Sequence, residues 1–325
     1  MKYALTTDVV RAAANTTGSG TNGGTDVTVT VRVTGTTTES VADDISTPSL
    51  TKGSVTVVGP RDFTLQLNGR LLTLNKGYRL KGFQITSGDP GGSAAGAAIK
   101  LDGVGTSLEN MRIDCEGLGT AGSDFTNNLG DRCIEVTALT LDGTILLQGL
   151  EVEIKGNQNH TAAIVHKGSR DTTLRVVGST IRSTDTGGQG VVGVLGSGGA
   201  SAGPVIVQSS TVDLRSIRSG QSGQGRAETI AVLLNVGGSK VSNSVIKLKG
   251  DNGHPKGSIG VKVNHSSSDP DPTVVVEGTT FETQTDRVGI GIYNYKVRGS
   301  GSLSLVNNTF PTSSPRLHED FFEGP

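Results

Sequence analysis

The sequence has no tryptophan, only two cysteines and few aromatic residues, 3% in all. Lys and Arg together number 29 and Asp and Glu number 30, so the formal net charge is −1. The basic residues neither cluster nor alternate with aromatic side chains, which argues against a nucleic-acid-binding surface. No apolar run reaches about 18 residues and no signal-peptide pattern stands at the start, so we expect neither a membrane-spanning helix nor an export precursor.

The abundant residue is glycine, with 48 positions, and the apolar residues form a repeat. A β-type apolar residue, one exposed residue and a second apolar or small residue return at intervals of about thirty residues, the irregular period of a solenoid with variable loops. The anchors of this repeat are Phe83, Met111, Leu150, Ile181, Val212, Ile246, Phe281 and Phe310.

Each repeat holds three short strands. An alternating strand leads into a tight turn, a second strand begins after the turn, and a third lies about halfway to the next anchor, as at 164–166 and 230–232. The turn is occupied by residues that tolerate a sharp corner, namely Gly178, Ser209, Asn243, Gly278 and Asn307. No helical periodicity separates the strands, so the pattern predicts an all-β parallel β-helix (a β-solenoid) of about eight coils.

Composition divides the chain into three segments. Residues 55–312 form the predicted β-helix. Residues 1–54 contain a flexible glycine-rich stretch and an alternating strand pattern, and are expected to cap the N-terminal end, because an open solenoid end exposes strand edges. Residues 313–325 form a C-terminal tail with two phenylalanines.

The residue after the anchor is charged at the six anchors from Met111 to Phe281, and its sign alternates from coil to coil. Stacked coils bring equivalent residues to about 4.8 Å, where unlike charges attract, so the alternation is what a correctly registered sheet would favour. The predicted ladder is Arg112, Glu151, Arg182, Asp213, Lys247 and Glu282.

The two cysteines, Cys115 and Cys133, flank the longest loop. We favour a disulfide over two buried thiols. A disulfide would stabilise the fold and imply an oxidising, extracytoplasmic setting. Metal binding is a poor third alternative, because neither cysteine has a CxxC partner or a nearby histidine.

The segments GLEVEIKGN, STIRSTD, SVIKLKGDNG and NNTF, each after an alternating strand and a small-residue corner, resemble right-handed parallel β-helix proteins of the pectin-lyase-like superfamily. The resemblance covers residues 55–312 and implies that fold. It is compatible with polysaccharide lyases, hydrolases, epimerases, phage tailspikes, adhesins and surface-layer modules. The catalytic signatures of these enzymes are mostly missing, because the sequence has no RxPxxR and no combination of NTD, DD, GHG and RIK. The nearest fragment to GHG has proline after Gly253 and His254, where glycine is required.

The best catalytic candidate is a group of charged residues on consecutive coils. Aligning the coils places Asp114 and Glu153 in one column and Arg112, Glu151 and Arg182 in the next column of the same face. Two neighbouring carboxylates could serve as nucleophile and acid in a retaining glycosidase. Together with Glu151 they could instead hold Ca²⁺ beside an arginine base. The alternative is a solvated charge ladder without chemistry.

Three weaker features complete the candidates. Tyr293 and Tyr295 alternate and could form a small glycan-binding platform. Asp269 and Asp271 could bind calcium, although the neighbouring prolines favour a simple turn. The outward positions of the third strand hold small residues and are expected to make a smooth ridge that suits a loop, a tail or a partner subunit; these are Gly193, Ala231, Gly260 and Gly291.

Three functions remain. The first is a non-catalytic extracellular or cell-surface module with a structural role or a polysaccharide or surface-layer partner. The second is a polysaccharide lyase or glycoside hydrolase acting at Arg112, Asp114, Glu151, Glu153 and Arg182. The third is a trimeric receptor binder similar to a tailspike. Beyond possible calcium, no cofactor is expected.

Overall fold

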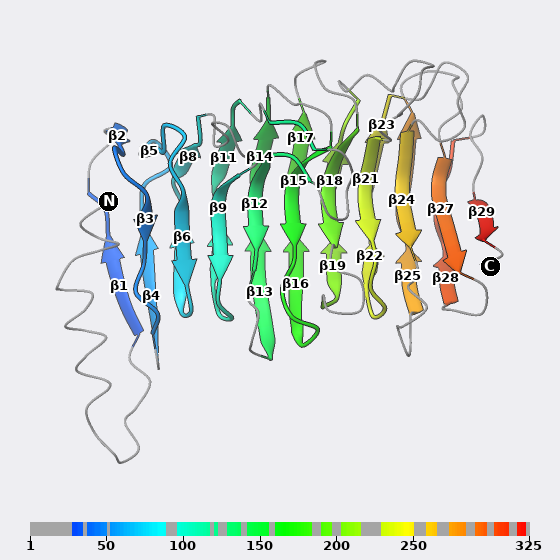
Figure 1. Ribbon diagram of the computed structural model, residues 1–325, viewed down its shortest axis with the longest axis horizontal. Coiled ribbons are helices and arrows are strands. Elements are labelled where there is room, and N and C mark those ends of the chain that lie inside the picture. Colours follow the sequence, from blue (N-terminus) through cyan, green and yellow to red (C-terminus); the bar gives the residue numbers. More distant parts are fainter. Residues whose placement is uncertain are drawn as a thin grey trace, which may run out of the picture.

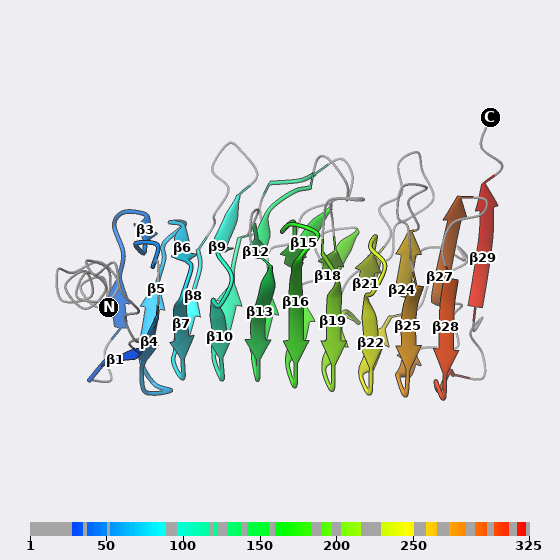
Figure 2. The same ribbon diagram turned by 90° about the horizontal axis from the view of Figure 1, so that it is seen from below.

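The computed structural model describes residues 28–34, 38–50, 53–88, 96–117, 120–122, 129–137, 142–155, 160–183, 190–196, 203–215, 229–249, 258–264, 273–283, 290–297, 302–311 and 317–322. The strands of these segments stack side by side along one long axis, from β1 at one end to β29 at the other (Figures 1 and 2). Within the described residues, no helix is long and apolar enough to cross a bilayer.

The strands form three sheets in which every pairing is parallel. Sheet A contains, in order, β1 (Thr28–Arg32), β4 (Ser54–Val58), β7 (Tyr78–Lys81), β10 (Ser107–Glu109), β13 (Gly143–Gln148), β16 (Thr172–Val177), β19 (Val205–Gln208), β22 (Lys240–Ser242), β25 (Thr273–Glu277) and β28 (Ser302–Val306). Sheet B contains β2 (Thr38–Ser40), β5 (Thr64–Gln66), β8 (Gln84–Thr86), β11 (Arg112–Cys115), β14 (Glu151–Ile154), β17 (Thr180–Ser183), β20 (Thr211–Asp213), β23 (Val245–Leu248) and β26 (Thr280–Thr283). Sheet C contains β3 (Ile45–Ser46), β6 (Leu72–Asn75), β9 (Ala97–Asp102), β12 (Arg132–Val136), β15 (Thr161–His166), β18 (Val191–Gly196), β21 (Thr229–Leu234), β24 (Ser258–Asn264), β27 (Ile290–Val297) and β29 (Leu317–Phe322).

The chain visits sheets A, B and C in that order in each coil, and this is a right-handed parallel β-helix, as predicted. Sheets A and C have 10 strands each, more than the number of coils expected from the sequence. Strands β1, β2 and β3 lie before residue 55 and pair with β4, β5 and β6. Strand β29 lies after residue 312 and pairs with β27. Strand pairing therefore extends beyond both predicted limits of the solenoid.

The corner between sheets A and B has the left-handed backbone that the sequence predicted. Gly178, Ser209, Asn243, Gly278 and Asn307 all have positive φ, between 48° and 57°. The position after the corner is buried and holds serine in three successive coils. Each of these serines accepts, at Oγ, the backbone N–H of the equivalent residue one coil earlier, as Ser210 does from Ser179 at 3.1 Å. This row of serine hydroxyls accepts hydrogen bonds from N–H groups at the bend that have no acceptor in the neighbouring strand.

The register of sheet B differs from the predicted alignment by two residues at one step. Ile181 pairs with Val152 and not with the predicted anchor Leu150. Leu150 instead lies level with Ser179, two residues before Ile181. The cause is that Leu150 and Val152 are both buried. A shift of two residues keeps the same side chains pointing inward, so the apolar pattern alone cannot distinguish the two alignments.

The slip divides the predicted charge ladder between two columns. Arg112 and Glu151 are directly paired in one column. The next members lie in the column that begins with Asp114, because Arg182 pairs with Glu153. This second column runs Asp114, Glu153, Arg182, Asp213, Lys247 and Glu282.

The expected smooth ridge on sheet C is wrong, because its small residues point into the solenoid. A Cβ atom on Gly193 would lie 2.6 Å from Cγ1 of Val212, and one on Gly260 would lie 2.6 Å from the Phe281 ring. Both of those neighbours are core residues of sheet B. Ala163 and Ile164 both join the inner core, so the strict alternation of a strand is broken here. The sequence prediction assumed that alternation.

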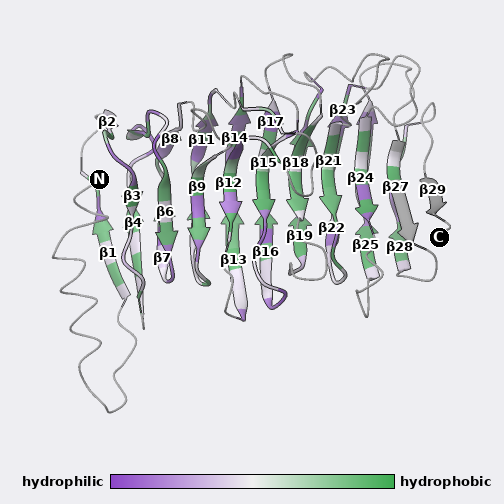
Figure 3. Cartoon of the chain, in the orientation of Figure 1, coloured by the Kyte–Doolittle hydropathy of each residue, from purple (hydrophilic) through white to green (hydrophobic). Residues whose placement is uncertain are grey.

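The outer face of sheet C carries larger apolar residues instead of the expected ridge of small ones. A second buried cluster lies there, separate from the inner core, and consists of Leu129, Ala162, Val165, Val192, Leu195, Ile230, Leu233 and Ile259. Hydrophobic colouring recurs along β15, β18 and β21 (Figure 3). Sheet C is thus buried on both faces over its middle coils, whereas sheet B carries the charged side chains on its outer face.

Candidate functional site

The predicted disulfide is present and joins sheet B to sheet C beside the charged residues. Cys115 ends β11 and Cys133 lies in β12, with Cα atoms 5.7 Å apart and a sequence separation of 18. Both residues are fully buried. The bond holds the strand that carries Arg112 and Asp114 against the next strand of the same coil.

Arg112 and Asp114 lie two residues apart on β11, so both side chains project from the outer face of sheet B. The Arg112 Nε donates to the two carboxylate oxygens of Asp114, at 3.0 Å and 3.1 Å. Its Nη2 donates to Oε2 of Glu153 on the next coil, at 3.2 Å. One arginine therefore bridges the two carboxylates that the sequence proposed as a catalytic pair.

Glu153 lies directly opposite Asp114 in the sheet and has two further cationic partners. Arg182 Nη2 donates to Oε2 at 2.7 Å, and Lys155 Nζ lies 3.5 Å from Oε1. The side chain of Glu153 is only 9% exposed. A carboxylate this deeply buried is costly unless cations compensate it. This geometry favours the charge-ladder interpretation over the catalytic one.

The electrostatics of Arg112 argue against the arginine-base hypothesis. Its hydrogen bond to Asp114, together with the negative charges of Asp114, Glu153 and Glu151, raises the pKa of the guanidinium above its usual value. A general base must give up its proton near the working pH. The surroundings of Arg112 shift it in the opposite direction, so it is suited to binding and ion pairing.

The calcium hypothesis lacks a ligand set in the part of the chain that the structure describes. No three His, Cys, Asp or Glu side chains gather there closely enough to hold a metal ion. Glu151 lies level with Arg112 and not with Asp114 and Glu153. The three carboxylates therefore do not converge on one point.

The charge ladder continues along sheet B. Asp213 accepts hydrogen bonds from Arg215, with Nε donating at 2.8 Å, and Lys247 lies 3.2 Å from Glu282. Burial alone would raise the pKa of Asp213, but the hydrogen bonds and charge of Arg215, with Lys247, outweigh it and leave the pKa below its usual value. Asp213 is therefore held ionised as part of a structural array.

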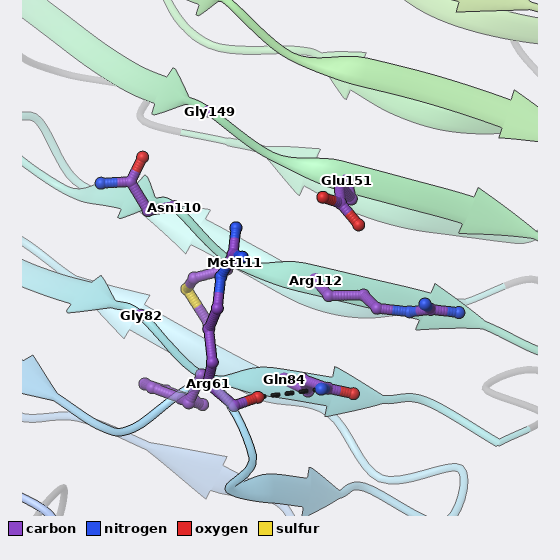
Figure 4. A pocket seen from close by; sticks show the side chains of 9 residues that line it. Arg61, Gly82, Gln84, Asn110, Met111, Arg112, Gly149 and Glu151 are labelled. Carbon is purple, nitrogen blue, oxygen red and sulfur yellow. Dashed lines mark hydrogen bonds between the residues drawn. The ribbon is translucent and has the colours of Figure 1, made fainter.

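Two shallow hollows lie side by side on this face and share Arg112 and Glu151. The first, of about 300 Å³, is lined by Arg112, Asp114, Glu151, Val152, Glu153, Thr180 and Arg182. The second, of about 170 Å³, is lined by Arg61, Gly82, Phe83, Gln84, Asn110, Met111, Arg112, Gly149 and Glu151. Figure 4 shows the second, with Arg61, Gln84, Arg112 and Glu151 projecting from successive coils. We call the two together the sheet B groove.

Glu151 and Arg61 differ from the other charged residues of the sheet B groove. Both are exposed. Among the described residues, neither side chain forms a hydrogen bond or an ion pair, although the backbone O of Arg61 accepts a hydrogen bond from Gln84 Nε2 at 2.8 Å. The sequence singled out Glu151 but missed Arg61, which lies in a turn without periodicity.

The remaining predicted residues fall largely outside the described part. Tyr293 and Tyr295 belong to β27, but their side chains are outside it, so the glycan platform stays a prediction. Asp269, Asp271 and His254 also lie outside the described residues.

His166, the last residue of β15, lies deep in the fold. It lies in the row of inward residues, level with Val136, and is fully buried. Its Nε2 is 2.8 Å from the carbonyl oxygen of Thr172, and the Gly168 N–H donates to Nδ1 at 3.3 Å. Burial lowers the pKa of His166 below 6.5, although the Thr172 contact opposes the shift. Its role is to satisfy backbone groups at a coil corner.

We therefore expect the protein to lose stability as the pH falls below 6.5, the ordinary value for histidine. There the unfolded chain binds a proton that the folded protein does not, whereas above 6.5 both hold neutral His166 and the stability is complete. The free energy of unfolding should fall by up to about 1.4 kcal/mol for each pH unit in this range. Urea denaturation between about pH 7.5 and pH 5 measures it, where carboxylates contribute little. His166→Gln should flatten the slope, and an unchanged slope would contradict the assignment; His160→Gln is the control.

No family model matches the sequence, and the search of curated proteins finds no match. Two solved structures are similar to the chain at low identity. The crystal structure of Escherichia coli YbhC is 10% identical, with 88% of this chain and 77% of that chain covered and a TM-score of 0.35. The Streptococcus pneumoniae surface protein and adhesin PfbA is 10% identical, with 97% and 94% covered and a TM-score of 0.27. At this distance neither structure bears on the function, which has to be inferred from the side chains.

Proposed function

We propose that this chain is a non-catalytic β-helix module of the cell exterior or cell surface that binds an extended polysaccharide in the sheet B groove. The observation that carries the proposal is the contrast between two kinds of carboxylate. Asp114 and Glu153 are neutralised by ion pairs with Arg112 and Arg182, whereas Glu151 remains available beside them. A retaining glycosidase needs one carboxyl group as proton donor and one as nucleophile, which a pair held by shared arginines does not offer.

The sheet B groove suits a polar chain. Carboxylates accept hydrogen bonds from sugar hydroxyl groups, and guanidinium and amide groups donate to sugar oxygens. Arg61, Gln84, Arg112 and Glu151 come from successive turns of the solenoid, and coils are about 4.8 Å apart. A linear polymer can therefore follow the sheet from one coil to the next. The buried disulfide supports an extracytoplasmic setting, because such bonds persist in oxidising compartments.

The test is incubation with a panel of acidic and neutral polysaccharides, with and without calcium. We expect binding by isothermal titration calorimetry for at least one polymer, and neither new reducing ends nor unsaturated-uronate absorbance for any. Glu151→Gln and Arg61→Gln should each weaken binding about tenfold, the loss of one hydrogen bond to a charged group. Glu277→Gln, on the outer face of sheet A, is the matched control and should bind like the wild type.

Two results would contradict the proposal. Cleavage of any polymer that disappears in Glu153→Ala would establish an enzyme and place its site at the ion-paired carboxylates. The absence of binding to every polymer, with the protein folded, would leave the sheet B groove without the proposed ligand.

A further inference from the structure

The two ends of sheet A are edge strands. Strand β28 pairs with β25 and β1 pairs with β4, and among the described residues neither has a partner on its other side. Leu305 and Val306, both in β28, are 37% and 43% exposed, and they are the large hydrophobic side chains in the described part that are exposed by more than a third. Uncovered strand edges of this kind are sites of association with other chains.

The inner core of sheet A ends at β28. The side of β28 that has no partner strand among the described residues is called the open end. Leu303 and Leu305 pair with Val274 and Val276, which are buried core residues, so the two leucines continue inward-facing columns. Among the described residues their columns end at this coil, and Leu305 is 37% exposed. Phe310 on the same coil stacks on Phe281, with ring centroids 4.9 Å apart, but its other face has no ring partner among the described residues.

The opposite end of sheet A is built in the same way. Val29 and Val31 of β1 pair with Val55 and Val57 and pack against the inner core while remaining only partly buried. Following the registers from coil to coil shows that Val29 stands at the head of the column that ends in Leu303, and Val31 at the head of the column that ends in Leu305.

The outward hydroxyl groups also match at the two ends. At the first coil, Thr28 Oγ1 lies 3.4 Å from Ser54 Oγ. At the last coil, Thr273 Oγ1 lies 2.8 Å from Ser302 Oγ. Strand β28 therefore alternates serine outward with leucine inward, and β1 alternates threonine outward with valine inward. Strand β28 carries no charged residue or proline, the usual devices that keep edge strands from pairing.

The backbone groups at the two ends are complementary. The Gly278 N–H donates to the carbonyl of Val306 at 2.9 Å, so alternate residues of β28 face β25 and the intervening Leu303 and Leu305 face the open end. At the other end the Val33 N–H donates to Val58 O at 2.8 Å, so Thr28, Thr30 and Arg32 face outward. In the register used throughout sheet A, the free backbone groups of Leu303 and Leu305 are therefore complementary to those of Thr28, Thr30 and Arg32.

We propose that the chain associates head to tail, with β28 of one copy adding in parallel to β1 of a second copy. Leu303 and Leu305 then stack on Val29 and Val31 of the next copy, and the serine hydroxyls meet the threonine hydroxyls. The contact repeats the coil-to-coil packing inside each molecule. Because the two surfaces are different, the association is heterologous and produces open chains of copies rather than a closed dimer.

Sedimentation velocity over a wide concentration range tests the proposal. We expect the weight-average sedimentation coefficient of the wild type to rise with concentration. Leu305→Pro removes an N–H that faces the open end and leaves the bonds to β25 intact, as proline on an edge strand permits. Thr30→Pro does the same at the other end. Each variant alone should lose the concentration dependence, whereas Leu305→Val and Thr30→Val should keep it.

Mixing the two proline variants separates head-to-tail association from every other arrangement. Each variant retains one intact end, so an equimolar mixture should form a one-to-one dimer and nothing larger. Formation of this dimer also shows that both variants are folded. A wild type that stays monomeric at all concentrations, association that survives both proline variants, or a mixture that stays monomeric would each overturn the proposal.

Discussion

Replacing Cys115 and Cys133 together by alanine is expected to lower the free energy of unfolding by about 3 kcal/mol. The disulfide closes a loop across a sequence separation of 18. Without it the unfolded chain regains the conformational freedom of that loop, while the folded coil keeps its sheet pairing on both sides, since β11 pairs with β8 and β14. Chemical denaturation of the oxidised wild type and of the double variant measures the difference.

The wild type under reducing conditions is the internal control, and its unfolding midpoint should approach that of the double variant. Any remaining difference reports the buried volume of the two sulfur atoms, because both residues are fully buried. Equal midpoints for the oxidised and reduced wild type would show that the bond contributes nothing to stability.

The sequence was sufficient to predict the fold because each coil repeats the same local chemistry. At five corners the sequence places Gly, Ser or Asn, and all five adopt the left-handed backbone angles that these residue types favour. The inward apolar residues then recur at each coil. The corner residues and the rows of inward apolar residues indicate the same coils. The architecture could therefore be inferred from the repeat without any relative of known structure.

The exact register was not predictable from the same pattern. Leu150 and Val152 are both buried on the same face, and either satisfies a rule that asks only for an inward apolar residue. The outward charges did not resolve the ambiguity, since Arg112 opposite Glu151 and Arg182 opposite Glu153 are both favourable pairs. Only the pairing of whole strands distinguishes the two alignments.

The sequence predicted which residues of the candidate site lie close together, but not how their side chains interact. Asp114 and Glu153 could be placed side by side because they occupy equivalent positions on consecutive coils. The bridging of both by Arg112 depends on side-chain conformations across two coils, which strand periodicity does not specify. Arg61 could not be found at all, because a residue in a turn has no repeating position that relates it to the groove.

Gly260→Ala is expected to destabilise the fold by about 3 kcal/mol, at the upper end of the cost of overpacking a core. The new Cβ would lie 2.5 Å from the carbonyl oxygen of Gly291 and 2.6 Å from Cε1 of Phe281. Neither neighbour can withdraw easily, since the first belongs to the backbone of the next coil and the second is a buried ring. If the position faced outward, as strict alternation would require, alanine would be harmless.

Two comparisons connect this cost to the contact itself. Gly178→Ala places a Cβ in open space but at a φ of +57°, so it should cost only about 1 kcal/mol of backbone strain. In the Gly260→Ala background, Phe281→Leu removes the ring that the new methyl group meets, so the double variant should be more stable than the sum of the two single effects predicts. Unfolding midpoints of the wild type, the two single variants and the double variant measure the coupling. Strict additivity would mean that Gly260 does not face Phe281, and that the inward placement of this column is incorrect.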